Sequence, residues 1–155
     1  MFVFETRYAP LYLQAFPPTF EYEEARAHFD EVEAHFRSLP LDAHAALIAD
    51  SSSVLKVDAR TRRRVAESFE RMSPLMEKRA VAHAIVLNNA VVRHALTGIF
   101  WLARPPWTIK TFARIELADV WVRSQFVPRG LPEVSAPPDW WREGVMQKLV
   151  VRRSA

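Results

Sequence analysis

A cluster of arginines and five scattered histidines are the side chains of this sequence most suited to binding or chemistry. Four arginines fall between residues 60 and 64, at the start of a predicted helix. Positive charge is mildly unfavourable there because that end of the helix dipole is positive, whereas the free amides at a helix start favour anions. We therefore predict a surface that binds an anion or an acidic protein partner, formed by Asp58, Arg60, Thr61, Arg62, Arg63 and Arg64. Surface arginines paired in salt bridges are the alternative.

The histidines show no spacing typical of a catalytic or metal site. His28 and His35 lie seven residues apart on a predicted helix, and we expect both to face solvent. His44 and His83 lie on predicted strands, where a metal-binding pair is the alternative to two separate side chains. None of the three glycines begins a phosphate-binding loop, and no nucleophile can be grouped with a base. We therefore expect no enzyme activity, no catalytic residue, no metal and no cofactor.

Composition narrows the class of protein. The chain has 155 residues, half of them hydrophobic and a quarter charged, which is typical of one globular domain. It has no cysteine, which excludes disulfides, thiol catalysis and Cys-ligated zinc and fits a cytoplasmic location. No apolar run reaches the length of a membrane-spanning helix, and the start of the chain reads as a strand rather than a signal peptide.

Charge is unevenly distributed. Residues 1–58 hold four Lys/Arg and ten Asp/Glu, a net −6, whereas residues 59–155 carry a net +9. The basic half could meet an anionic partner, pair with the acidic half within one fold, or face a second copy of it. We do not expect nucleic-acid binding, because the basic residues alternate with acidic ones and no recognition motif accompanies them.

Hydrophobic periodicity predicts strands that alternate with helices. An α/β fold follows, with the order ββαβαβαβα and about five strands in a mixed sheet with helices packed on it. Pro74 should kink or split the second helix, and Thr19 is the expected N-cap of the first. The predicted strands are 2–8, 11–16, 44–49, 81–87 and 107–113, and the predicted helices are 20–38, 60–79, 90–102 and 115–126.

The same periodicity indicates which helix faces point inward. On the last two helices we expect one inward stripe of Val91, Ala95 and Ile99, and another of Leu117, Trp121 and Ser124. These four-residue and three-residue steps are typical of one helix face.

Aromatic residues suggest a second kind of site. Phe100, Trp101 and Trp107 could line a pocket for an apolar ligand. After the domain predicted at 1–127, residues 128–155 read as a proline-rich linker and tail that carries Trp140 and Trp141. The large apolar side chains of two adjacent tryptophans are expected to be shielded from water. We expect them to pack on their own domain, and a homodimer contact is the alternative.

Four segments between residues 20 and 126 form a familiar pattern: the central strand 46–50, the helix start 57–60, the helix 92–100 and the strand and helix 112–121. Together they resemble the STAS family, whose best-known members are bacterial anti-sigma-factor antagonists. The chain is most similar to the SpoIIAA-like branch, which shares its fold with CRAL-TRIO-type lipid-binding domains.

The resemblance implies a regulatory, non-enzymatic module that binds a protein partner. Arg60 stands where the antagonists carry their phosphorylated serine, so partner switching by phosphorylation is not expected at that position. An apolar-ligand or lipid-binding domain is the alternative function.

Overall fold

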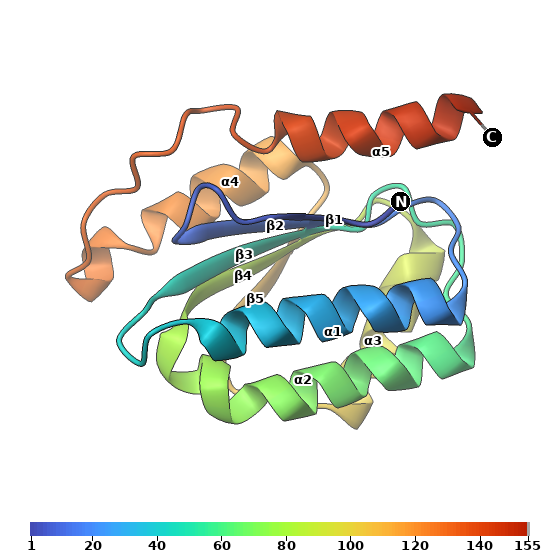
Figure 1. The fold of residues 1–155 in the computed structure, drawn as a ribbon, viewed down its shortest axis with the longest axis horizontal. Coiled ribbons are helices and arrows are strands. Elements are labelled where there is room, and N and C mark those ends of the chain that lie inside the picture. The colour runs from blue at the N-terminus through green and yellow to red at the C-terminus, as the bar shows by residue number, and fades with distance from the viewer. Residues whose placement is uncertain (155) are drawn as a thin grey trace.

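A computed structural model describes residues 1–154 and shows one five-stranded sheet with helices on both of its faces (Figure 1). The strands lie side by side in sequence order; β1 is antiparallel to β2 and all other neighbours are parallel. The predicted α/β fold, its order ββαβαβαβα and its mixed five-stranded sheet are confirmed. The strands are β1 (Val3–Glu5), β2 (Leu11–Ala15), β3 (Ala45–Asp50), β4 (Ala80–Val86) and β5 (Ile109–Phe112).

The helices form two layers. From β2 to β5 each crossover leads to the next strand in the same direction, and right-handed crossovers then place all the connecting helices on one face. Figure 1 shows α1, α2 and α3 on that face and α4 and α5 on the other. The helices are α1 (Tyr22–Ser38), α2 (Ala59–Arg79), α3 (Ala90–Leu102), α4 (Ile115–Ser124) and α5 (Arg142–Ser154), with a 3₁₀ turn at Val127–Arg129.

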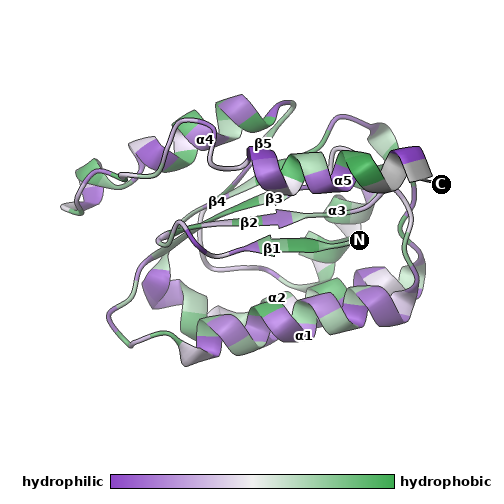
Figure 2. Ribbon diagram, turned by 45° about the horizontal axis from the view of Figure 1, so that its top comes forward, coloured by the Kyte–Doolittle hydropathy of each residue, from purple (hydrophilic) through white to green (hydrophobic). Residues whose placement is uncertain are grey.

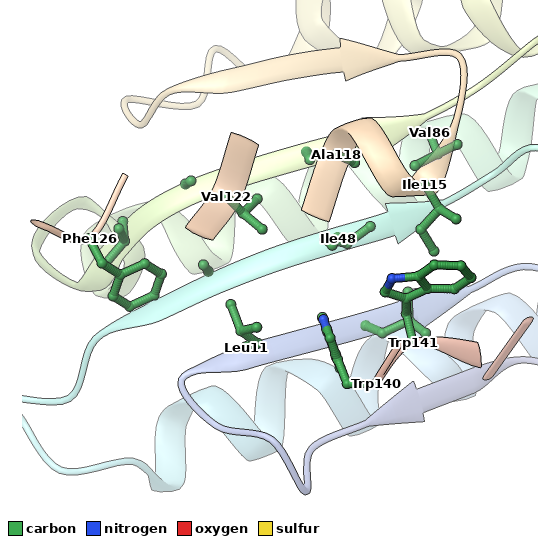
Figure 3. Close-up of a cluster of buried hydrophobic side chains, with 14 residues drawn as sticks. Leu11, Ile48, Val86, Ile115, Ala118, Val122, Phe126, Trp140 and Trp141 are labelled. Atoms are coloured by element: carbon green, nitrogen blue, oxygen red, sulfur yellow. The ribbon is translucent and has the colours of Figure 1, made fainter. Parts of the chain in front are cut away.

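The two faces of the sheet differ in side-chain size. The face under α4 and α5 includes three buried alanines of the sheet, Ala46, Ala82 and Ala84. Ala118 of α4 packs in the same cluster (Figure 3). A Cβ at Gly144 of α5 would lie only 2.6 Å from Leu13 Cδ2. These small residues let α4 and α5 lie closer to the strands than α1, α2 and α3 do.

The opposite layer is built from larger side chains. Tyr12 and Leu47 of the sheet meet Phe36 of α1 and Met72 and Met76 of α2. Figure 2 shows the mainly hydrophobic strands between the layers and hydrophilic residues along α1 and α2. Side chains of this size keep these helices further from the sheet. Where they do not fill the layer between helices and strands completely, space remains on this face.

The start of α1 differs from the prediction, and of the two outcomes predicted at Pro74, a kink or a split, the split is wrong. The N-cap of α1 is Glu21 and not Thr19, because Glu21 and Glu24 form a reciprocal capping box. Pro74 does not split α2, which runs unbroken through it. The hydroxyl of Ser73 donates to the Phe69 carbonyl within this stretch.

The inward faces of α3 and α4 were also misassigned. Val91 is 52% exposed, and Val92 takes its place beside Ala95 and Ile99. On α4 the inward residues are Ile115, Ala118 and Val122 rather than Leu117. The buried residues of both helices recur at the expected three-residue and four-residue steps. The wrong face was chosen because each helix also carries apolar residues on its exposed side.

The tail packs on its own chain, as expected for the two tryptophans. Trp140 and Trp141 are buried with α4 and the strands in one hydrophobic cluster (Figure 3). The Trp140 indole donates to Asp119 at 2.9 Å. Arg123 holds the proline-rich segment by donating to the carbonyls of Ala136 and Pro137 at 2.9 and 2.8 Å.

A buried ion pair fixes α5 at the end of β3. The Lys148 ammonium contacts the Asp50 carboxylate, and both side chains are almost fully buried. Asp50 also accepts hydrogen bonds from the Ser52 amide and hydroxyl, at 3.1 and 2.6 Å. Within the described chain, no helix has the length and apolar composition needed to span a membrane.

Candidate functional site

A cavity of about 130 Å³ lies between the sheet and the α1–α3 layer. All three helices and strands β2, β3 and β4 contribute to its wall, which is almost entirely apolar; the wall includes Phe29, Leu47, Phe69, Met72, Ile85 and Ile99. Small side chains at Ala49, Ser68 and Ala95 leave the space that the large ones enclose. An apolar cavity of about 150 Å³ in another protein stays dry and binds benzene, so this volume suits a small apolar molecule.

His83 is the most unusual residue of the cavity wall. It lies in the middle of β4, is only 6% exposed and stacks against Phe69 with a centroid distance of 5.9 Å. The Trp107 indole Nε1–H donates to its Nδ1 at 3.3 Å. Because an indole can only donate, the ring proton of neutral His83 must sit on Nε2. That atom is buried and has no hydrogen-bond partner within residues 1–154.

Burial keeps the His83 ring uncharged. Desolvation lowers the pKa of His83 to about 4, so the imidazole is neutral at pH 7. The other polar side chains of the wall carry no ionisable group; they are Gln14, Ser51, Thr61 and Ser68.

His28 of α1 does not face solvent, contrary to the prediction. It stacks on Phe2 at 4.6 Å between centroids, and its Nε2 lies 3.3 Å from the Gln14 amide oxygen. Burial lowers its pKa to about 4. His35 is half-buried against Phe4 and Tyr12. The first strands cover this side of α1, which the periodicity of α1 alone does not reveal.

The start of α2 is stabilised by an N-cap at Asp58. Its carboxylate accepts from the Thr61 amide at 2.7 Å and from the Thr61 hydroxyl at 3.0 Å. The amide hydrogen bond is the main reason why the pKa of Asp58 is lowered. Asp58 and Thr61 therefore close the helix end, and Thr61 also lines the cavity.

Two of the clustered arginines pair with the acidic side chains of α1. Arg64 is 3% exposed and lies 2.7 Å from Asp30 and 3.1 Å from Glu33. Arg60 stacks over the Tyr22 ring at 3.6 Å and reaches Glu23. The acidic and basic halves of the sequence thus meet within one chain at the α1–α2 contact.

Arg62 and Arg63 are placed differently. Arg63 is exposed and Arg62 is half-buried. Neither forms an ion pair with any residue that the structure describes. A surface for an anionic partner at this helix start stays a prediction, and these two arginines are the ones free to contribute charge to it.

The predicted aromatic residues do not form one site. Trp107 lines the cavity, and Phe100 packs against the cavity residue Phe69 at 5.7 Å. Trp101 is 78% exposed. Trp140 and Trp141 lie on the opposite face of the sheet.

His83 was not predicted to line a cavity. A histidine flanked by alanines in an otherwise apolar strand was the available signal. Among the described residues, no group of three or more His, Asp or Glu side chains is arranged to hold a metal ion.

Comparison with protein families, with curated proteins and with solved structures gives no significant match. The resemblance to the STAS family therefore stays a prediction.

Proposed function

We propose that this chain is a non-enzymatic binding protein whose ligand is a small apolar molecule held in the cavity between the sheet and α1–α3. The apolar wall of this cavity carries the proposal. Ligand pockets are mostly apolar, with a few polar groups that fix orientation.

Filling the cavity tests this proposal. Ala95 of α3 lines the cavity, whereas Val91 of the same helix is exposed. Benzene should raise the thermal unfolding midpoint of the unmodified protein, because a ligand that binds only the folded state stabilises it. Ala95→Leu should abolish that rise, and the control Val91→Leu should retain it. An equal rise in all three proteins would contradict binding in the cavity.

We also propose that the start of α2 is a docking surface for a protein partner, in line with the predicted regulatory role. Exposed Arg63 and half-buried Arg62, which form no ion pair with a described residue, support docking of an acidic protein partner there. Reversing both charges should abolish capture of such a partner from cell extract. The control is Arg114→Glu, because Arg114 is exposed and precedes α4 on the other layer. Unchanged capture by the double variant would exclude this surface.

A further inference from the structure

The cavity wall is uncharged. Among the described residues that line it, none is Asp, Glu, Lys or Arg. A charged group placed against such a wall would lose its hydration and gain no opposite charge, so its binding there is disfavoured.

Two charged side chains that contact residues of the cavity wall, Arg64 and Asp58, already have partners. Arg64 lies 5.9 Å from the ring centre of Phe29, which lines the cavity, but its guanidinium is held by Asp30 and Glu33. Asp58 is held by Thr61. A ligand that recruited either charge would have to break these interactions.

The polar groups of the wall are also suited to neutral partners. Gln14 pairs with His28, and the Thr61 hydroxyl donates to Asp58. His83 is uncharged at pH 7 because burial lowers its pKa, so it cannot neutralise an anion.

We infer that the cavity selects a small uncharged molecule and rejects carboxylates and ammonium ions of the same size. This inference rests on the proposed function and specifies its ligand class. It separates this chain from binders of free fatty acids, which need a cation or several donors for the carboxylate. The volume sets the size at about that of one aromatic ring.

A series of ligands built on one ring tests the inference. Toluene and benzyl alcohol are neutral, whereas benzoate and benzylammonium carry opposite charges at pH 7. Calorimetric titration of the unmodified protein should show binding of both neutral molecules. We expect each charged molecule to bind roughly 100-fold more weakly, or not at all. The titrations are repeated with Ala95→Leu, which should remove binding of the neutral molecules.

The outcomes separate the two claims. If benzoate or benzylammonium binds as tightly as benzyl alcohol and Ala95→Leu removes that binding, the charge selection is wrong and the cavity remains a ligand site. If none of the four molecules binds, the proposed function and the inference both fail.

Discussion

His83 and His28 are neutral histidines buried on the same side of the sheet, on β4 and on α1. Neither has an acidic partner that would favour its charged form; their neighbours are Trp107, Phe69, Phe2 and Gln14. Protonating either ring would place an unpaired charge in an apolar layer, so the folded state resists protonation.

Acid should therefore destabilise the protein before most carboxylates titrate. Each pKa falls from 6.5 in the unfolded chain to about 4 in the fold, so between these values the unfolded state binds more protons. The stability that these two histidines contribute is fully present well above pH 6.5 and is lost as the pH falls from 6.5 to 4. Two such groups give a slope of about 2.5 kcal/mol per pH unit near pH 5, measurable by urea unfolding. His28→Phe should halve that slope; an unchanged slope would contradict the assignment.

At the scale of the elements, the order of strands and helices could be predicted because apolar spacing reports the period of each segment. The sequence did not show which side of α3 and of α4 points toward the sheet. Val91 and Val92 are adjacent valines, and only the position of the sheet decides which is buried. Leu117 likewise is apolar but exposed, because α4 faces the strands with Ile115 and Ala118.

The candidate site was less predictable than the fold. Phe29 of α1 and Met72 of α2 are buried on the inner faces of their helices, and they also line a cavity. Whether side chains fill a layer or leave space depends on contacts between distant segments, such as Ala49 of β3 and Ala95 of α3. Sequence spacing carries no information about that fit. For the same reason the sequence does not show that Arg60 and Arg64 pair with acidic residues of α1.

The docking of α5 depends on a close approach that the sequence shows only as a glycine. Gly144→Ala places a methyl group 2.6 Å from the buried Leu13 side chain. We expect the protein to lose about 1–3 kcal/mol of stability, despite the better helix propensity of alanine.

Gly98 is the matched control, because it lies within α3 and a Cβ there would meet nothing within 4 Å. Gly98→Ala should stabilise the protein by up to about 1 kcal/mol. Chemical denaturation of both variants decides the matter; a stabilising effect of Gly144→Ala would show that α5 is not seated against β2 as described.

At the scale of the whole molecule, one sheet supports two layers with different properties. On one side, small residues, two buried tryptophans and the Lys148–Asp50 ion pair make a close-packed cover. On the other, large side chains keep three helices further from the strands and enclose an apolar cavity. We propose that the cavity side is the part of the fold that accepts a ligand.

The four methionines allow the most direct test of ligand binding in this cavity. Met72 and Met76 line the cavity, whereas Met1 and Met146 are exposed elsewhere. In a protein labelled with ¹³C at the methionine methyl groups, benzene titration followed by NMR should shift the Met72 and Met76 signals to saturation and leave those of Met1 and Met146 in place. Met72 and Met76 signals that do not move when benzene approaches its solubility limit would contradict the account.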